Sequence, residues 1–290
     1  MPLVSSAPLL RAARAQGYAV TAFNVHTLEM LQAVVEAATE LDAPVILQST
    51  TGTVQHLGPE FIAAAARVAA DQTHVPVALH LDHCTNFATV VKCIRAGYTS
   101  IMIDASMKPY EANVADTRRV VELANAIGVN VEAELGKVGG VEDDISVADH
   151  DAALADPDEC ARFVMDTGVP TLAPAIGTAH GIYKGEPNID FDRIARIAAL
   201  VDVPLVLHGG SGIPEAQVRR AISLGMAKMN VATELRIVFT DAIKQVFACT
   251  PNVDDPRHYL KPAKDALREA VKEKIRMCGA AGRASEAKGR

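Results

Sequence analysis

The sequence lacks any apolar run long enough to cross a bilayer; its longest runs, such as residues 61–66, are far too short. Its first residues lack the basic stretch and apolar segment of a secretory signal. An excess of positive charge is also missing, because the net charge is −7 and the pI is near 5.7. This balance argues against nucleic acids or membranes as partners, so a phosphate-bearing ligand would need a local site.

Paired cysteine motifs are absent as well. The five cysteines are scattered along the chain, and no two of them form a C-x-x-C pair. An odd, scattered set favours a reduced, cytoplasmic protein over a disulfide framework. We interpret each as a small buried hydrophobic residue, and only Cys84 lies beside a candidate metal ligand.

Short apolar, β-branched runs alternate with longer segments whose apolar residues recur three and four positions apart. The runs predict strands at 19–23, 44–48, 76–81, 100–103, 130–134, 171–176, 204–207 and 227–231. The longer segments predict helices at 28–41, 59–71, 87–96, 110–127, 157–167, 190–201, 214–224 and 234–247.

Eight strands alternating with eight helices are typical of a closed (β/α)₈ barrel, an α/β fold that often has this length. An additional C-terminal helix is expected at 261–277. With no low-complexity linker, we predict one domain over residues 1–278 and a frayed tail over 279–290. An open doubly wound sheet is the alternative, but the first strand leads into Asn24-Val25-His26 and not into a glycine-rich fingerprint.

The carboxyl ends of the predicted strands are unusually polar. In a barrel these ends form the active-site mouth. They carry Asn24, Gln48, Ser49, Asp82, His83, Asp104, Glu134, His180, His208 and Asn230. Three histidines with one open position describe a catalytic zinc site, so His83, His180 and His208 are the predicted metal ligands. His80, inside a strand, is interpreted as structural.

Two glycine-rich or helix-opening loops follow the last two strands. Residues 208–212 read HGGSG before a helix, and residues 230–233 read NVAT, again at a helix start. Backbone N–H groups and helix N-termini at this point of a barrel are typical of a phosphate cradle. A third loop, 134–144, has glycines and an acidic tip, and we interpret it as a mobile lid carrying a carboxylate.

These motifs together resemble those of class II, metal-dependent ketose-bisphosphate aldolases. The resemblance runs in order along nearly the whole chain, through AFN (22–24), HLDH (80–83), MIDAS (102–106), VEAELG (131–136), AIGTAHG (175–181), LHGGSG (207–212) and NVATEL (230–235). It implies the reversible cleavage of a ketose 1,6-bisphosphate to dihydroxyacetone phosphate and glyceraldehyde 3-phosphate.

The resemblance also implies roles for single residues. One zinc ion (Zn²⁺) would be bound by His83, His180 and His208 and act as a Lewis acid. Asp82 would exchange the proton of the C4 hydroxyl, and Glu142 on the lid would protonate the reacting carbon. Asp104 and Glu134 would serve a second or alternate metal position.

Further residues are expected to bind substrate. They are Asn24, Ser49, Gly181, Gly209, Gly210, Ser211, Asn230, Ala232, Thr233 and Arg257. The resemblance adds a monovalent cation, sodium or potassium, near the phosphate. It implies that Arg257 reaches a neighbouring subunit's site, which would make the protein a homodimer or homotetramer.

The substrate is expected to be tagatose 1,6-bisphosphate, with fructose 1,6-bisphosphate as the alternative. Many fructose-bisphosphate members carry an acidic or amide residue where this chain has Ala232, and the NVATEL form resembles the tagatose branch.

Three other functions are alternatives. A Schiff-base aldolase would need a lysine at the mouth, and Lys228 is the only nearby strand candidate. A non-catalytic barrel that binds metal and sugar phosphate would not explain why the acidic residues Asp82 and Glu142 accompany the metal ligands. A metal-dependent hydrolase barrel would need a paired His-x-His, which is not evident.

Overall fold

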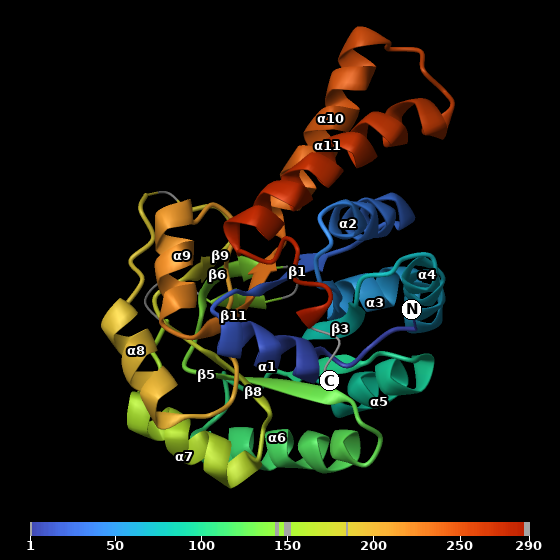
Figure 1. The fold of residues 1–290 in the computed structure, drawn as a ribbon. Coiled ribbons are helices and arrows are strands. Elements are labelled where there is room, and N and C mark those ends of the chain that lie inside the picture. Colours follow the sequence, from blue (N-terminus) through green and yellow to red (C-terminus); the bar gives the residue numbers. More distant parts are fainter. Residues whose placement is uncertain (1, 143–144, 148–151, 184, 287–290) are drawn as a thin grey trace.

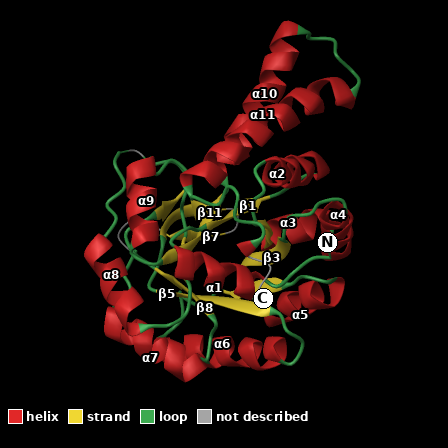
Figure 2. Ribbon diagram, in the orientation of Figure 1, coloured by secondary structure: helices red, strands yellow, loops and turns green. Residues whose placement is uncertain are grey.

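The structure is a computed structural model that describes residues 2–142, 145–147, 152–183 and 185–286. Eight parallel strands close into a barrel in the order β1-β2-β3-β4-β5-β8-β10-β11. Helices surround these strands in Figure 2, with the strands inside. The predicted (β/α)₈ barrel is therefore confirmed.

The barrel strands are β1 Val20–Asn24, β2 Val45–Thr50, β3 Val77–Cys84, β4 Ser100–Ile103, β5 Asn130–Leu135, β8 Thr171–Pro174, β10 Leu205–Leu207 and β11 Met226–Val231. The helices are α1 Ser6–Gln16, α2 Leu28–Glu40, α3 Thr51–Leu57, α4 Pro59–Asp71, α5 Phe87–Ala96, α6 Tyr110–Asn125, α7 Pro157–Thr167, α8 Phe191–Leu200, α9 Glu215–Ser223, α10 Thr233–Cys249 and α11 Pro256–Met277. Two of these, α1 and α3, have no counterpart among the predicted helices.

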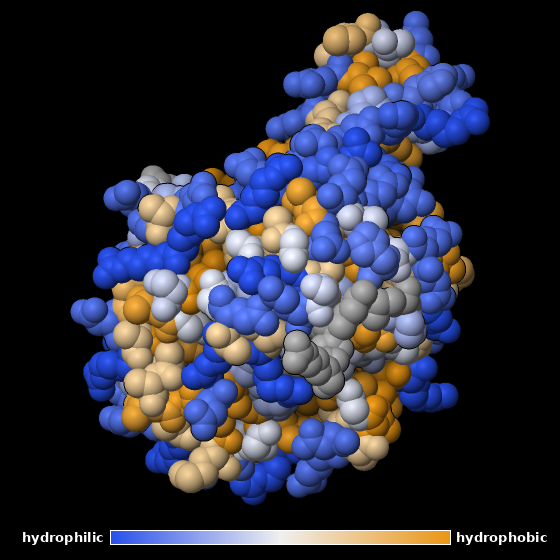
Figure 3. Space-filling model, viewed as in Figure 1, coloured by the Kyte–Doolittle hydropathy of each residue, from blue (hydrophilic) through white to orange (hydrophobic). Residues whose placement is uncertain are grey.

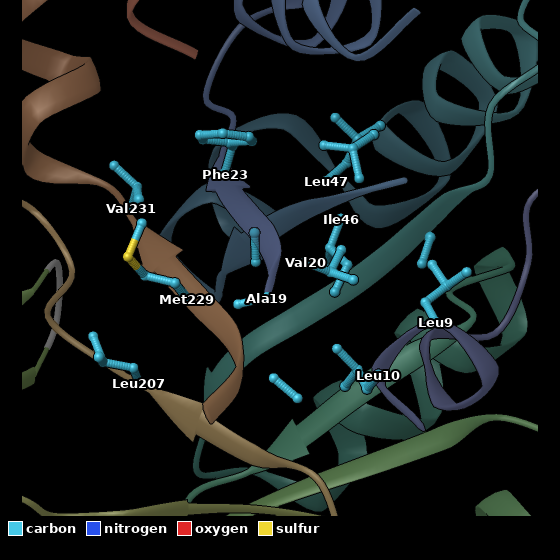
Figure 4. Close-up of a cluster of buried hydrophobic side chains, with 14 of the residues drawn as sticks. Leu9, Leu10, Ala19, Val20, Phe23, Ile46, Leu47, Leu207, Met229 and Val231 are labelled. Atoms are coloured by element: carbon cyan, nitrogen blue, oxygen red, sulfur yellow. The ribbon is translucent and has the colours of Figure 1, made fainter. Parts of the chain in front are cut away.

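Helix α1 covers the amino-terminal end of the barrel. Leu9 and Leu10 are buried and lie beside the apolar side chains of β1 and β2 in Figure 4. The Ser6 hydroxyl donates a hydrogen bond to Ser100 (2.8 Å) and accepts one from Asn130 Nδ2 (2.9 Å), at the starts of β4 and β5. With this end closed, the opposite end, where the strands finish, is left for a site.

A second, smaller sheet stands where we expected a lid loop. Strands β6 Gly139–Glu142 and β7 Ile145–Val147 form an antiparallel hairpin, and β6 also pairs with β9 Ala179–His180. Residues 139–142 of the loop predicted at 134–144 therefore form a strand, held by backbone hydrogen bonds to β7 and β9.

Helices α10 and α11 pack against each other and project from the barrel as an arm (Figure 1). Helix α11 begins several residues before the predicted 261–277, because the Asp255 side chain caps it by accepting from Arg257 N and Pro256 occupies its first turn. Hydrophobic residues are visible among hydrophilic ones on the arm in Figure 3.

The chain after α11 folds back onto the barrel. Gly282 N donates to Leu41 O, and Ala284 N donates to Asp42 O, each at 2.9 Å. Ala284 is buried. The expected fraying therefore does not hold for residues 279–286, while residues 287–290 lie outside the described chain. That residues 1–278 form one domain stays a prediction.

None of the helices in the described part of the chain combines the length and apolar character needed to cross a membrane.

Candidate active site

Strand β3 delivers two consecutive polar residues to the barrel mouth. Its register against β4 shifts, so that Leu81 pairs with Ile101 but Cys84 pairs with Ile103, which leaves one extra residue in β3. His83 lies in this bulge with φ +46°, a left-handed conformation that is rare outside glycine. Neighbouring strand residues normally face opposite sides, and the bulge explains how Asp82 and His83 both reach the site.

Carboxylates hold two of the three predicted histidine ligands. His83 Nδ1 lies 2.9 Å from Asp104 Oδ2. His208 lies between two glutamates of β5, with Nε2 3.0 Å from Glu132 Oε1 and Nδ1 2.9 Å from Glu134 Oε2. All five residues are buried, so these bonds restrict the ring orientations more than surface contacts would.

Backbone contacts position the third histidine, His180. Gly140 of β6 pairs with it, and a Cβ at Gly140 would lie 2.1 Å from His180 O. Gly209 makes a similar approach, since its Cβ would lie 2.3 Å from Ala179 O. Tyr183 OH accepts a hydrogen bond from Ala179 N and donates one to Gly209 O, which joins the loops that carry His180 and His208.

The three histidines meet at one point of the mouth. Ring centroids lie 4.8 Å apart for His83 and His180 and 4.6 Å apart for His83 and His208. Potential ligand atoms of all three lie within 4.8 Å of one another. The set His83, Asp104 and Glu134 satisfies the same criterion, as the predicted alternate metal position requires.

This donor set fits a divalent metal ion. Among the described residues, the buried His83 Nε2 has no hydrogen-bond partner, although the ring is held through Nδ1. A buried imidazole nitrogen without a partner is costly unless something coordinates it. Imidazole ligands backed by carboxylates are the usual environment of zinc.

The histidine pKa values differ with their surroundings. Burial alone would lower the pKa of His208, but hydrogen bonds to Glu132 and Glu134 outweigh it and raise the pKa to about 9. Burial is likewise outweighed at His83, where Asp82 and Asp104 raise the pKa well above its usual value. Burial and the neighbouring His83 and His208 lower the pKa of His180 well below its usual value.

Asp82 is fully buried beside these rings. Its carboxylate accepts hydrogen bonds from Gln48 Nε2 (3.1 Å) and Asn230 Nδ2 (3.2 Å). Burial would raise the pKa of Asp82, but His83 and His80 outweigh it and hold the pKa well below its usual range. The carboxylate is therefore ionised near neutral pH and can accept a proton.

The two predicted phosphate loops lie next to each other. Ser211 Oγ accepts hydrogen bonds from Ala232 N and Glu234 N, each at 3.3 Å. Gly210 N donates to Asn230 O at 3.0 Å. Helix α10 begins at Thr233, where Ser211 Oγ accepts from one first-turn N–H, and the N-terminus of the helix adds positive potential at this point.

Several other predicted site residues have different positions. Asn24 Oδ1 accepts from Gln48 Nε2 inside the mouth, and Gly181 directly follows His180. The Ser49 hydroxyl instead lies 2.7 Å from the Tyr98 hydroxyl. Residues alternate between the two faces of a strand, so Gln48 faces the mouth and Ser49 does not, which corrects the prediction for Ser49.

Of two further predicted residues, Arg257 lies away from the site of its own chain, and the side chain of Glu142 is not described. Arg257 lies in the first turn of α11, and its side chain is 87% exposed and paired with Asp255. Glu142 ends strand β6, but its side chain lies outside the described part of the chain, as do Asp143 and Asp144.

Sequence reasoning missed part of the site. Gln48 was noted only as a strand end, and Glu132, His80 and Lys228 were given no role in holding the ligands. Every second residue of a strand faces the same side. Glu132 and His80 lie two residues before Glu134 and Asp82, so this rule would have assigned both to the barrel interior.

The family described as fructose-bisphosphate aldolase class-II matches residues 4–283. The chain belongs to this family. It is therefore a class II aldolase, a carbon–carbon lyase, and the Schiff-base and hydrolase alternatives are set aside.

Two individual proteins similar to this chain are described as aldolases, and a third structure shares its fold. The chain is 48% identical over 282 residues to the D-tagatose-1,6-bisphosphate aldolase subunit GatY of Klebsiella oxytoca, covering 97% of this chain and 99% of that protein. The crystal structure of the YdjI aldolase from Escherichia coli K12 has a TM-score of 0.85 at 34% identity, over 97% of this chain and 99% of that one. The fructose-bisphosphate aldolase of Campylobacter jejuni shares the fold, with a TM-score of 0.80 at 22% identity over 97% of each chain.

We predict that zinc binding to the metal-free chain releases protons near neutral pH. His208, with a pKa of about 9, carries a proton there, and a metal ligand must lose it. Apparent zinc affinity should therefore rise as pH rises toward about 9. Titration calorimetry in buffers with different ionisation heats measures the release, and a binding heat independent of the buffer would contradict the prediction.

Proposed function

We propose that this class II aldolase cleaves tagatose 1,6-bisphosphate reversibly to dihydroxyacetone phosphate and glyceraldehyde 3-phosphate with one zinc ion per subunit. The observation that carries the proposal is the convergence of His83, His180 and His208 beside an ionised Asp82. A catalytic acid–base group next to three imidazoles matches the needs of metal-assisted carbon–carbon cleavage.

The three histidines would hold the zinc ion, and Asp104 and Glu134 would offer it a second or alternate position. When bound, zinc supplies Lewis-acid stabilisation of the charge that develops on the dihydroxyacetone half as C3–C4 breaks. Asp104 and Glu132 orient His83 and His208 through the ring nitrogens on the far side from the ion.

Asp82 is the proposed base for cleavage. Its carboxylate takes the proton of the C4 hydroxyl, the C4–O bond becomes the aldehyde carbonyl, and the C3–C4 electron pair passes to C3. Gln48 and Asn230 orient the carboxylate by donating to it, and they leave it able to accept one more hydrogen. In the condensation direction Asp82 returns the proton to the aldehyde oxygen.

Glu142 is the proposed acid that delivers a proton to C3 and completes dihydroxyacetone phosphate. Its place at the turn of the β6–β7 hairpin supports this role, because β6 pairs with the backbone of His180. We propose that the end of this hairpin acts as the lid that brings the carboxyl group to the substrate.

The phosphate of the dihydroxyacetone half would bind between the loops after β10 and β11. Gly181, Gly209, Gly210, Ser211, Asn230, Ala232 and Thr233 would line this cradle, and Asn24 would contact the sugar. Backbone N–H groups and the N-terminus of α10 support an anion site there. We also propose that a sodium or potassium ion binds beside this phosphate.

Arg257 would bind the distal phosphate of the substrate held in a neighbouring subunit's active site. We therefore propose a homodimer or homotetramer. Support comes from the arm, where Arg257 is exposed and Phe247 is 40% exposed while its ring contacts Tyr259. The scattered cysteines support a cytoplasmic location.

The choice of tagatose rests on Ala232 and on the 48% identity with the Klebsiella tagatose-bisphosphate aldolase subunit. Fructose 1,6-bisphosphate remains the second candidate, because the family that matches the chain is described by that substrate. A barrel that only binds metal and sugar phosphate is a third candidate, and it is opposed by the buried, ionised Asp82 beside the histidines.

We predict that Asp82→Asn lowers kcat about 100- to 10,000-fold while zinc stoichiometry stays at one, because the amide cannot accept the C4 hydroxyl proton. Coupled-enzyme kinetics and metal analysis measure the two quantities. Asp116→Asn is the control, since that carboxylate pairs with Lys108 on the surface. Wild-type kcat in Asp82→Asn would rule out the proposed base.

We predict that kcat/KM of the zinc enzyme is at least about tenfold higher for tagatose than for fructose 1,6-bisphosphate, as expected when a site pairs with one hydroxyl orientation. Initial rates with both epimers decide this. A reversed ratio would favour the fructose enzyme, and no turnover of either epimer would favour the non-catalytic barrel.

A further inference from the structure

The interior of the barrel contains charged residues one layer below the predicted catalytic residues. His80, Glu132 and Lys228 each lie two residues before Asp82, Glu134 and Asn230 on β3, β5 and β11, so both sets face inward. All three are at most 1% exposed. Branched apolar residues usually fill the interior layers of such a barrel. A charged residue buried there loses its hydration, and it therefore needs partners that compensate for that loss.

Lys228 links the other two residues of this lower layer. Its Nζ donates to Glu132 Oε2 at 2.7 Å and lies 3.3 Å from His80 Nε2. Both carboxylate oxygens of Glu132 are thereby used, because Oε1 faces His208 Nε2 at 3.0 Å. The ammonium group therefore fixes the carboxylate that faces the metal-ligand ring.

His80 is itself fixed from below. Its Nδ1 lies 2.7 Å from Ser100 Oγ, and Ser100 Oγ accepts a hydrogen bond from Ser6 of helix α1. A chain of buried contacts thus runs from the helix that closes the barrel, through His80 and Lys228, to Glu132 and His208. Within this chain of contacts, His80 Nε2 also lies 3.7 Å from Asp82 Oδ1.

An imidazole ring that binds a metal must present the correct nitrogen. Nδ1 of His208 faces Glu134, which belongs to the upper group with His83 and Asp104. Nε2 faces down to Glu132. If Glu132 lost its second anchor, its carboxylate could rotate away, and the ring would lose the contact that selects Nδ1 for the metal.

We propose that Lys228, Glu132 and His80 are positioning residues that hold the His208 ring so that Nδ1 points to the metal. The inference rests on the proposed metal site of this aldolase and assigns Lys228, a lysine that takes no part in covalent catalysis, to that site. Lys228 acts only through Glu132, so their effects on metal binding are not additive.

The test uses Co²⁺ as the probe, with affinity measured by competition against a chromophoric chelator and with the visible spectrum of the loaded protein. Glu132→Gln and Lys228→Met are each expected to lower Co²⁺ affinity about 10- to 100-fold and to change the spectrum. The double variant Lys228→Met/Glu132→Gln should bind within about threefold of Glu132→Gln alone, because Lys228 has nothing left to position.

Lys272→Met is the matched control. Lys272 is also a largely buried lysine, paired with Glu40 and Glu269, but it lies on α11 outside the barrel. Its loss should leave Co²⁺ affinity and spectrum unchanged. Circular dichroism verifies that each variant is folded.

Wild-type Co²⁺ affinity and spectrum in Glu132→Gln or Lys228→Met would overturn the inference. So would a double variant much weaker than Glu132→Gln, since Lys228 would then act independently. If Lys228→Met alone fails to fold, the comparison of the double variant with Glu132→Gln still decides the matter. Failure of the wild-type chain to bind Co²⁺ or Zn²⁺ would instead refute the proposed metal site.

Discussion

The mouth of this barrel depends on the hydrogen bonds between buried carboxylates and imidazole rings. A metal site needs three lone pairs that converge, yet each imidazole can rotate about two bonds. Asp104 restrains His83 through Nδ1, and Glu132 restrains His208 through Nε2, which leaves His208 Nδ1, beside Glu134, for the metal. In a dry interior such bonds are costly to leave unmade, which makes the ring orientations well defined.

Backbone geometry provides the rest of the constraint. The bulge in β3 and the positive φ of His83 bring that ring beside Asp82, at the expense of an uncommon conformation. Gly140 and Gly209 allow the β6 hairpin and the loop after β10 to approach the backbone around His180. The strain at His83 and the close approaches of Gly140 and Gly209 thus lie next to the three histidines, as expected if the fold is adapted to that point.

Much of this arrangement could be predicted from the sequence. Apolar periodicity gave the barrel, and the rule that strand ends form the site gave His83, His180 and His208. Local sequence patterns did not predict α1 or the β6–β7 hairpin, because both are stabilised by partners far away in the sequence. They also placed the start of α11 too late, because the Asp255 cap extends this helix. Ser49 was misassigned because strand parity was not applied.

Lys228 illustrates the other limit. From sequence it was a possible Schiff-base nucleophile, because its strand leads to the mouth. The structure buries it beneath the site and pairs it with Glu132, so its chemistry is set by neighbours far away in the sequence. Pairings of this kind depend on which residues share an inner layer of the closed barrel, and local sequence patterns do not encode that directly.

X-ray absorption spectroscopy of the zinc-loaded protein tests the central claim most directly. The account predicts a zinc ion with three imidazole nitrogen ligands at about 2.0–2.1 Å. A first shell dominated by carboxylate oxygens, or one with fewer than three imidazole nitrogens, would contradict it.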